Sequence, residues 1–127
     1  MSLIQYKLEY PINTSVSILY KRLSTPSGLS EWFADNVNIK NDILTFFWDG
    51  SEEQAIVLKK KKEDFIRYQW LEHQGEDRYF DFQIQIDDMT KDICLIITDF
   101  AEDEDEKEEG IMLWNKEIDN LKNAIGI

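Results

Sequence analysis

The sequence predicts an α+β fold in which a curved antiparallel sheet of about seven strands wraps around one long C-terminal helix. Between residues 36 and 100, short segments of alternating apolar and polar residues are separated by turn-forming residues, as in successive antiparallel strands. After residue 110 the apolar residues recur every three or four positions, which is typical of an amphipathic helix: Ile111, Trp114, Ile118, Leu121 and Ile125. The chain has 127 residues, 43% of them hydrophobic, so residues 1–127 are expected to form a single domain with one core.

The N-terminal part predicts one strand followed by two short helices. Apolar and polar residues alternate over residues 4–10, which indicates a strand with one buried face. Thr14 or Asn13 then offers a capping oxygen to a helix with apolar residues at positions 16, 19, 20 and 23. Thr25-Pro26 is typical of a second helix start, and this helix is expected to carry Leu29, Trp32 and Phe33 on its inner face.

Six further strands are expected at residues 36–39, 43–48, 54–60, 65–71, 78–86 and 93–100. The connections between them are short, so consecutive strands should be antiparallel neighbours in a meander. The alternation places residues 66, 68 and 70 on one face and residues 80, 82, 84 and 86 on another, while Asp81, Gln83 and Gln85 are expected to face water. The strand at 93–100 is apolar on both faces, so the sequence does not decide which of its faces points to the core.

Charge and cysteine content restrict the location and partners of the protein. The formal net charge is −12, which repels nucleic-acid phosphates and anionic lipids, so neither nucleic acid nor membrane is expected as a partner. The single cysteine permits no intrachain disulfide, which suits a reducing compartment. The N-terminal residues lack the basic stretch and apolar run of a signal peptide, and a cytoplasmic location is therefore expected.

Several segments resemble the START-like (SRPBCC) superfamily, and within it the proteins related to the activator of Hsp90 ATPase. The resemblance rests on residues 19–33, which end in Trp32-Phe33, on Phe46-Phe47-Trp48, on Ile96-Ile97-Thr98-Asp99 and on the final helix with Trp114 and Leu121. It covers essentially the whole chain and implies the helix-grip fold, with a cleft between the concave sheet and the last helix. Across the superfamily that cleft serves lipids, hormones, polyketides or chaperone contacts. These are packing motifs, so the resemblance implies no catalytic residue.

The cleft implied by the resemblance would be lined by large apolar side chains. The candidates are Trp32, Phe33, Phe46, Trp48, Tyr68, Trp70, Phe80, Phe82, Trp114 and Ile118. Aromatic residues also dominate ordinary cores, so the same residues are equally consistent with a closed interior. Our leading hypothesis is a noncatalytic binding domain that holds a small apolar or amphipathic ligand in this cleft.

The acidic segment at residues 102–109 supports a second hypothesis. Its simplest interpretation is a solvated loop followed by the first turn of the final helix, where carboxylates interact well with the helix dipole. The alternative is a docking site of a protein-interaction domain, of the chaperone-regulator kind, at Glu102, Asp103, Glu104, Asp105 and Glu106. The spacing of a calcium-binding loop is absent from this segment.

The sequence assigns no catalytic residue, metal site or cofactor. It contains no Ser-His-Asp arrangement, phosphate-binding glycine loop or nucleotide motif. His73 lies in an expected hairpin turn and should be exposed, and Cys94 lies in an apolar strand and should belong to the core. A third hypothesis is a cyclase or dehydratase, in which Tyr, Asp or Glu side chains act as acids inside the cavity.

Overall fold

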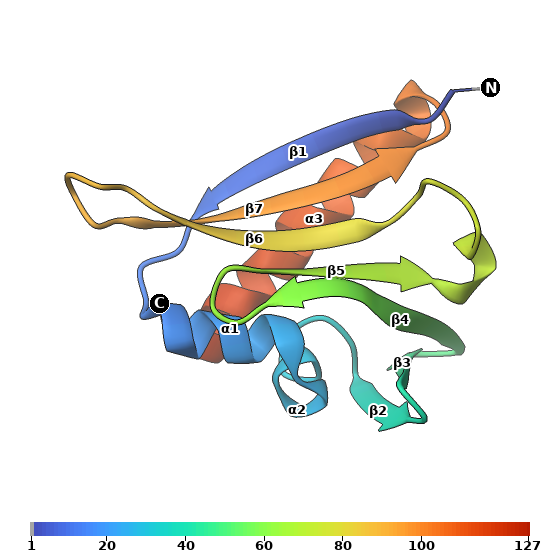
Figure 1. Ribbon diagram of the computed structural model, residues 1–127, viewed down its shortest axis with the longest axis horizontal. Coiled ribbons are helices and arrows are strands. Elements are labelled where there is room, and N and C mark those ends of the chain that lie inside the picture. The colour runs from blue at the N-terminus through green and yellow to red at the C-terminus, as the bar shows by residue number, and fades with distance from the viewer. Residues whose placement is uncertain (1) are drawn as a thin grey trace.

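The computed structural model describes residues 2–127, which form a single sheet and its covering helices (Figure 1). The elements follow one another as β1 (Ile4–Pro11), α1 (Val16–Ser24), α2 (Pro26–Leu29), β2 (Asn36–Lys40), β3 (Ile43–Trp48), β4 (Ser51–Lys61), β5 (Phe65–Trp70), the 3-10 helix η1 (Leu71–His73), β6 (Phe80–Ile86), β7 (Ile93–Ala101) and α3 (Glu104–Ile125). The predicted order of strands and helices is therefore confirmed. The strand bounds differ from the prediction by a few residues at most.

The sheet has seven strands in the order β1-β7-β6-β5-β4-β3-β2, and all neighbours are antiparallel. Strands β2 to β7 form the predicted meander. β1 pairs with β7 along its whole length, from Ile4 opposite Ala101 to Pro11 opposite Cys94. Because β1 and β2 occupy opposite edges, α1 and α2 carry the chain across one end of the sheet, while α3 crosses its concave face (Figure 1).

The register settles the orientation of β7, which the sequence left open. Leu95 and Ile97 are fully buried and lie opposite Ile84 and Phe82 of β6, so they face the core. Asp99 continues the same alternation and therefore points to the concave face as well.

On the outward face of the sheet, one expectation about solvent exposure was wrong. Asp81 was expected to face water, but it is buried because the Arg67 guanidinium covers it, with Nε 3.1 Å from the carboxylate. The same guanidinium lies 3.9 Å from the centre of the Tyr79 ring.

The helix boundaries near the N terminus differ from the prediction in two respects. The oxygen that caps α1 belongs to Ser15, which accepts a hydrogen bond from the amide of Ile18, and not to Thr14 or Asn13. Thr25 caps α2 as expected, but α2 ends at Leu29. Trp32 and Phe33 follow in a tight turn whose amides bond to the carbonyls of residues 28 and 29, and this turn directs both aromatic rings into the interior.

The final helix begins earlier than its apolar period predicts. Asp103 caps α3 by accepting a hydrogen bond from the amide of Glu106 at 2.8 Å, so most of the acidic segment is helical. Carboxylates at this end are favourable because they face the positive end of the helix dipole. The helix ends at Gly126, as predicted, where a positive φ of 91° suits glycine.

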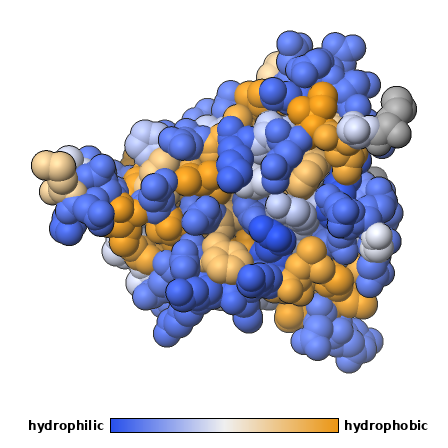
Figure 2. Space-filling view, turned by 45° about the horizontal axis from the view of Figure 1, so that its top comes forward, coloured by the Kyte–Doolittle hydropathy of each residue, from blue (hydrophilic) through white to orange (hydrophobic). Residues whose placement is uncertain are grey.

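The core lies between α3 and the concave face of the sheet. Trp114, Ile118 and Leu121 of α3 are buried there. Hydrophilic residues cover most of the face seen in Figure 2, and hydrophobic residues appear on it as separate patches. None of the helices formed by residues 2–127 is both long and apolar enough to cross a membrane.

The packing of α3 against the sheet can be tested by shortening one buried side chain of the helix. Ile118 is 1% exposed, so Ile118→Ala should lower the free energy of unfolding by about 2–5 kcal/mol because it leaves a cavity. Denaturant melts measure this, with Met112→Ala as the control, since Met112 lies on the same helix and is 71% exposed. Equal losses in the two variants would show that α3 is not packed as described.

Candidate functional site

A cavity of about 340 Å³ lies between α3 and the sheet. We call it the inner cavity. Most of its wall is aromatic or aliphatic, with two carboxyl groups, and the lining residues are Phe33, Trp48, Trp70, Phe80, Asp99, Gly110, Leu113, Trp114 and Glu117. They come from the turn after α2, from β3, β5, β6 and β7, and from one face of α3.

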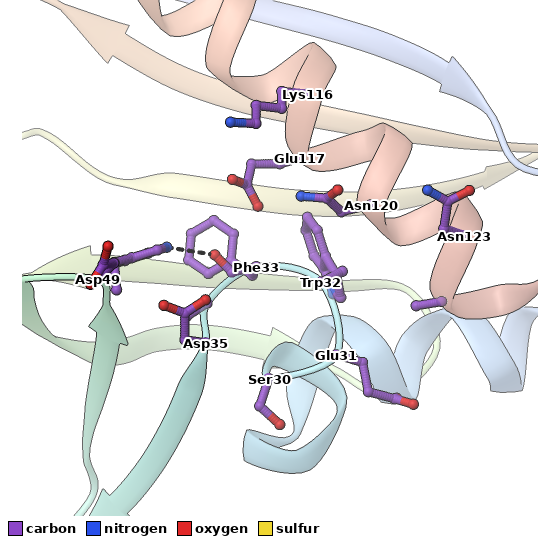
Figure 3. A pocket seen from close by; sticks show the side chains of 13 residues that line it. Ser30, Glu31, Trp32, Phe33, Asp35, Asp49, Lys116, Glu117, Asn120 and Asn123 are labelled. Atoms are coloured by element: carbon purple, nitrogen blue, oxygen red, sulfur yellow. Dashed lines mark hydrogen bonds between the residues drawn. The ribbon is translucent and has the colours of Figure 1, made fainter.

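The aromatic wall of the inner cavity is built around Phe33. Its ring stacks on Trp114 with centroids 5.8 Å apart and on Phe80 at 5.9 Å. Trp48 donates its indole N–H to the carbonyl of Phe33 at 2.8 Å, which is the dashed bond in Figure 3. Each ring is thus held by its neighbours, so the wall is preorganised.

A wider groove of about 830 Å³ runs along α3 toward its C-terminal end (Figure 3). We call it the outer groove. Phe33, Trp48 and Glu117 line both the outer groove and the inner cavity, so the two spaces adjoin. The remaining lining residues are mostly polar: Ser30, Glu31, Trp32, Ala34, Asp35, Asp49, Lys116, Asn120, Asn123 and Ala124.

A third space of about 250 Å³ adjoins the other end of the inner cavity and shares Trp70, Asp99, Gly110 and Leu113 with it. His73 lines this space. The expectation that His73 is exposed was wrong, because η1 folds the chain back after β5 and leaves only 17% of the side chain accessible. Its Nε2 lies 3.5 Å from the carboxylate of Glu72.

Asp99 is the centre of a hydrogen-bond network at the cavity wall. The Trp114 indole N–H donates to its Oδ2 at 2.9 Å, the Tyr6 hydroxyl donates to the same oxygen at 3.4 Å, and the Phe100 amide donates to Oδ1 at 2.8 Å. Burial raises the pKa of Asp99 above its usual range, although these hydrogen bonds and the nearby Arg78 act in the opposite direction.

Glu117 differs from Asp99 because one of its oxygens is unpaired. Its Oε2 is buried and has no hydrogen-bond partner within the described part of the chain. Burial raises the pKa of Glu117 to about 7, and the negative charge of Asp35 adds to this effect, while Lys116 opposes it. A carboxyl group with this pKa is present in both protonation states at neutral pH.

Sequence reasoning assigned no role to either carboxyl group, although Glu117 had a readable signal, whereas that of Asp99 needed the orientation of β7. Glu117 lies three residues after Trp114 and next to Ile118, on the apolar stripe of the final helix. Asp99 continues the inward alternation of Leu95 and Ile97. An acidic residue on an otherwise buried face indicates a polar feature of the interior.

The cleft candidates named from the sequence divide into three groups. Those in the wall of the inner cavity are Phe33, Trp48, Trp70, Phe80 and Trp114, and Trp32 lines the outer groove. Phe46, Tyr68, Phe82 and Ile118 line none of these spaces, because they are buried under their neighbours as ordinary core.

The acidic candidates serve mainly to hold α3 in place. Asp103 is its N-cap, and Glu102 and Glu106 lie 3.5 Å and 2.7 Å from the Arg78 guanidinium. Glu104 and Asp105 are exposed in the first turn.

Cys94 does not lie in the core as expected. It is half-buried on the outward face of β7, because it alternates with the inward-facing Leu95. Across residues 2–127, no group of three or more His, Cys, Asp or Glu side chains is arranged to hold a metal ion.

A family model described as a START-like superfamily domain matches residues 1–127. The chain belongs to the START-like superfamily. Among solved structures, BfR322 from Bacteroides fragilis is 35% identical to this START-like chain, with a TM-score of 0.70 over 100% of this chain and 94% of that one. No curated protein matches the chain.

Two more distant structures share the START-like fold with this chain. The Aha1 dimer from Colwellia psychrerythraea is 18% identical, with a TM-score of 0.76 over 98% of this chain and 96% of that one. DynU16, a protein in the dynemicin biosynthetic locus, is 12% identical with a TM-score of 0.79 over 96% of this chain, which covers 47% of DynU16.

The environment of Glu117 should make the stability of the protein depend on pH. Because the pKa of Glu117 rises from 4.5 to about 7 on folding, its protonation stabilises the fold at low pH, and this contribution is lost as the pH rises through about 7. Glu117→Gln should therefore raise the free energy of unfolding at pH 8 by on the order of 1–3 kcal/mol, and by less at pH 5.

Denaturant melts at the two pH values measure this difference. Asp119→Asn is the control, since it removes the same charge from an exposed position of α3. An equal effect of both substitutions at pH 8 would contradict the assignment of the raised pKa to Glu117.

Proposed function

We propose that this START-like domain is a noncatalytic binding module that holds a small apolar or amphipathic molecule in the inner cavity. The observation that supports it is the unfilled volume of about 340 Å³ behind a mainly aromatic wall. Ligand sites of small molecules commonly have volumes of roughly 300–1,000 Å³ and combine apolar walls with a few polar groups. The inner cavity has both properties.

One border of the inner cavity is a close contact between α3 and β1. Gly110 lines the cavity on α3, and a β-carbon at this position would collide with the Tyr6 hydroxyl. The inner cavity opens to solvent where Leu113 is 62% exposed, so a molecule can enter it. An accessible space with a mainly apolar wall favours a role in binding.

The two carboxyl groups favour a ligand with both an apolar and a polar part. Asp99 lies on β7 and Glu117 on α3, and aromatic rings make up most of the rest of the lining. An apolar body would contact the rings while a polar group reaches a carboxylate.

The same carboxyl groups support an enzyme of the cyclase or dehydratase kind as a second candidate. Such a reaction needs a proton donor or acceptor in a water-poor cavity, and a group with a pKa near the working pH is best suited to it. The pKa of Glu117, about 7, meets this requirement. Turnover of a bound ligand that Glu117→Gln abolishes, while binding is retained, would favour the enzyme over the binding module.

A protein-interaction domain is less well supported by the acidic segment. Glu102 and Glu106 are paired with Arg78, and Asp103 is engaged as a helix cap. These intramolecular contacts account for three of the five acidic residues. No partner protein is needed to explain those three.

Binding in the inner cavity can be tested with an uncharged fluorescent probe such as N-phenyl-1-naphthylamine. Its emission should increase saturably with protein concentration, and it should raise the melting temperature because it binds only the folded state. Leu113→Trp should weaken this binding about tenfold or more, since Leu113 lines the cavity and its larger replacement fills the space.

Met112→Trp is the matched control, because Met112 is the preceding residue and lines none of the three spaces. Both positions are largely exposed, so neither substitution should unfold the protein. The absence of saturable probe emission with the parent protein, or equal weakening in both variants, would contradict the binding proposal.

A further inference from the structure

The ionisable side chains that line the inner cavity itself are both acidic. Its two ionisable lining residues are the acids Asp99 and Glu117, and among the described residues no lysine, arginine or histidine lines it. An anionic ligand would place its charge beside these two carboxyl groups, and like charges repel. The cavity therefore disfavours carboxylates and phosphates.

Glu117 lines this space and carries one oxygen that no donor of the described chain engages. Its Oε2 is buried without a partner, whereas Oδ1 and Oδ2 of Asp99 already accept hydrogen bonds from Phe100, Trp114 and Tyr6. A buried carboxylate oxygen without a donor is costly, and a donor or a positive charge supplied by a ligand would relieve that cost. Glu117 is thus the group that a ligand can pair with most favourably.

The aromatic wall is also suited to a cation. Rings of Phe33, Trp48 and Trp114 border the space into which Glu117 faces. The faces of such rings attract ammonium groups, and several rings together form the usual cage for quaternary ammonium ligands.

The outer groove continues the same charge toward solvent (Figure 3). Glu31, Asp35 and Asp49 line it, against the single base Lys116. Glu31 is paired with Arg22 at 3.1 Å, so Asp35 and Asp49 are the acids that balance Lys116 there. The net charge of −12 also attracts cations to the protein as a whole.

We propose that the ligand of the inner cavity is a cationic amphiphile, with an apolar body that packs on the aromatic wall and a protonated amine or quaternary ammonium group that binds Glu117. This inference rests on the proposed binding function and specifies the chemical class of its ligand.

Three competing ligands of equal chain length separate the effect of charge from that of apolar contact: decylamine, decanol and decanoate. Each is titrated against the protein carrying N-phenyl-1-naphthylamine, whose displacement reports the cavity and not the acidic surface. Decylamine should displace the probe at a concentration about tenfold lower than decanol, and decanoate should be the weakest. Decylamine that is no stronger than decanol overturns the inference but leaves the binding function intact. Failure of the fluorescent probe itself to bind overturns both.

The role of Glu117 is tested with Glu117→Gln, which keeps the shape of the side chain and removes its charge. In this variant decylamine and decanol should displace the fluorescent probe at similar concentrations. Asp119→Asn, which removes an exposed charge of the same helix, should retain the preference for decylamine over decanol. A preference that persists in Glu117→Gln would overturn the assignment.

The pH dependence of decylamine binding is an independent test of the contact with Glu117. Glu117 is flanked by Lys116 on its own helix, by Asp35 and Glu31 before β2, by Asp49 after β3 and by Asp99 on β7. Since its pKa is about 7, the carboxylate forms between about pH 6 and about pH 8, where the alkylamine stays protonated. The affinity for decylamine should increase over this range and that for decanol should not, and a flat profile for decylamine would overturn the inference.

Discussion

The packing of Trp114 against the sheet is the interaction on which the rest of the structure depends. Its ring stacks on Phe33, while its indole N–H donates to Asp99 of β7 at 2.9 Å. One residue thus joins α3, the turn after α2 and β7, the strand next to the β1 edge of the sheet. Since Asp99 sits on the concave face, this hydrogen bond sets how closely the N-terminal half of α3 approaches the strands.

The inner cavity results from the way α3 approaches the strands. Where α3 comes closest to β1, Gly110 leaves room for the Tyr6 hydroxyl. Nearer its C-terminal end, Ile118 and Leu121 are fully buried and close the interior. The space between these two contacts is bordered by rings that already hold one another, so no side chain can move in to fill it without breaking their stacking.

The chain places its acids in two different environments. Those at the start of α3 stabilise the helix by capping and by pairing with Arg78, and they remain near solvent. Asp99 and Glu117 lie instead beside the inner cavity, where partial burial raises the pKa of both carboxyl groups. Buried acids reduce stability unless something pairs with them, and of these two only Asp99 has both oxygens paired within the chain.

The sequence by itself determined the fold, because it depends on periodicities that are local. The alternation over residues 36–100 and the stripe of Trp114, Ile118 and Leu121 specified the antiparallel meander and the helix that crosses it, and the structure confirms both. Only the tertiary structure decided which aromatic residues border a space and which fill the core, since Phe80 and Phe82 lie two residues apart on the same face and differ only in what packs above them. It likewise decided the pairing of Asp99 with Trp114 and the isolation of the Glu117 oxygen, because both depend on the distance between a helix and a strand that no local pattern encodes.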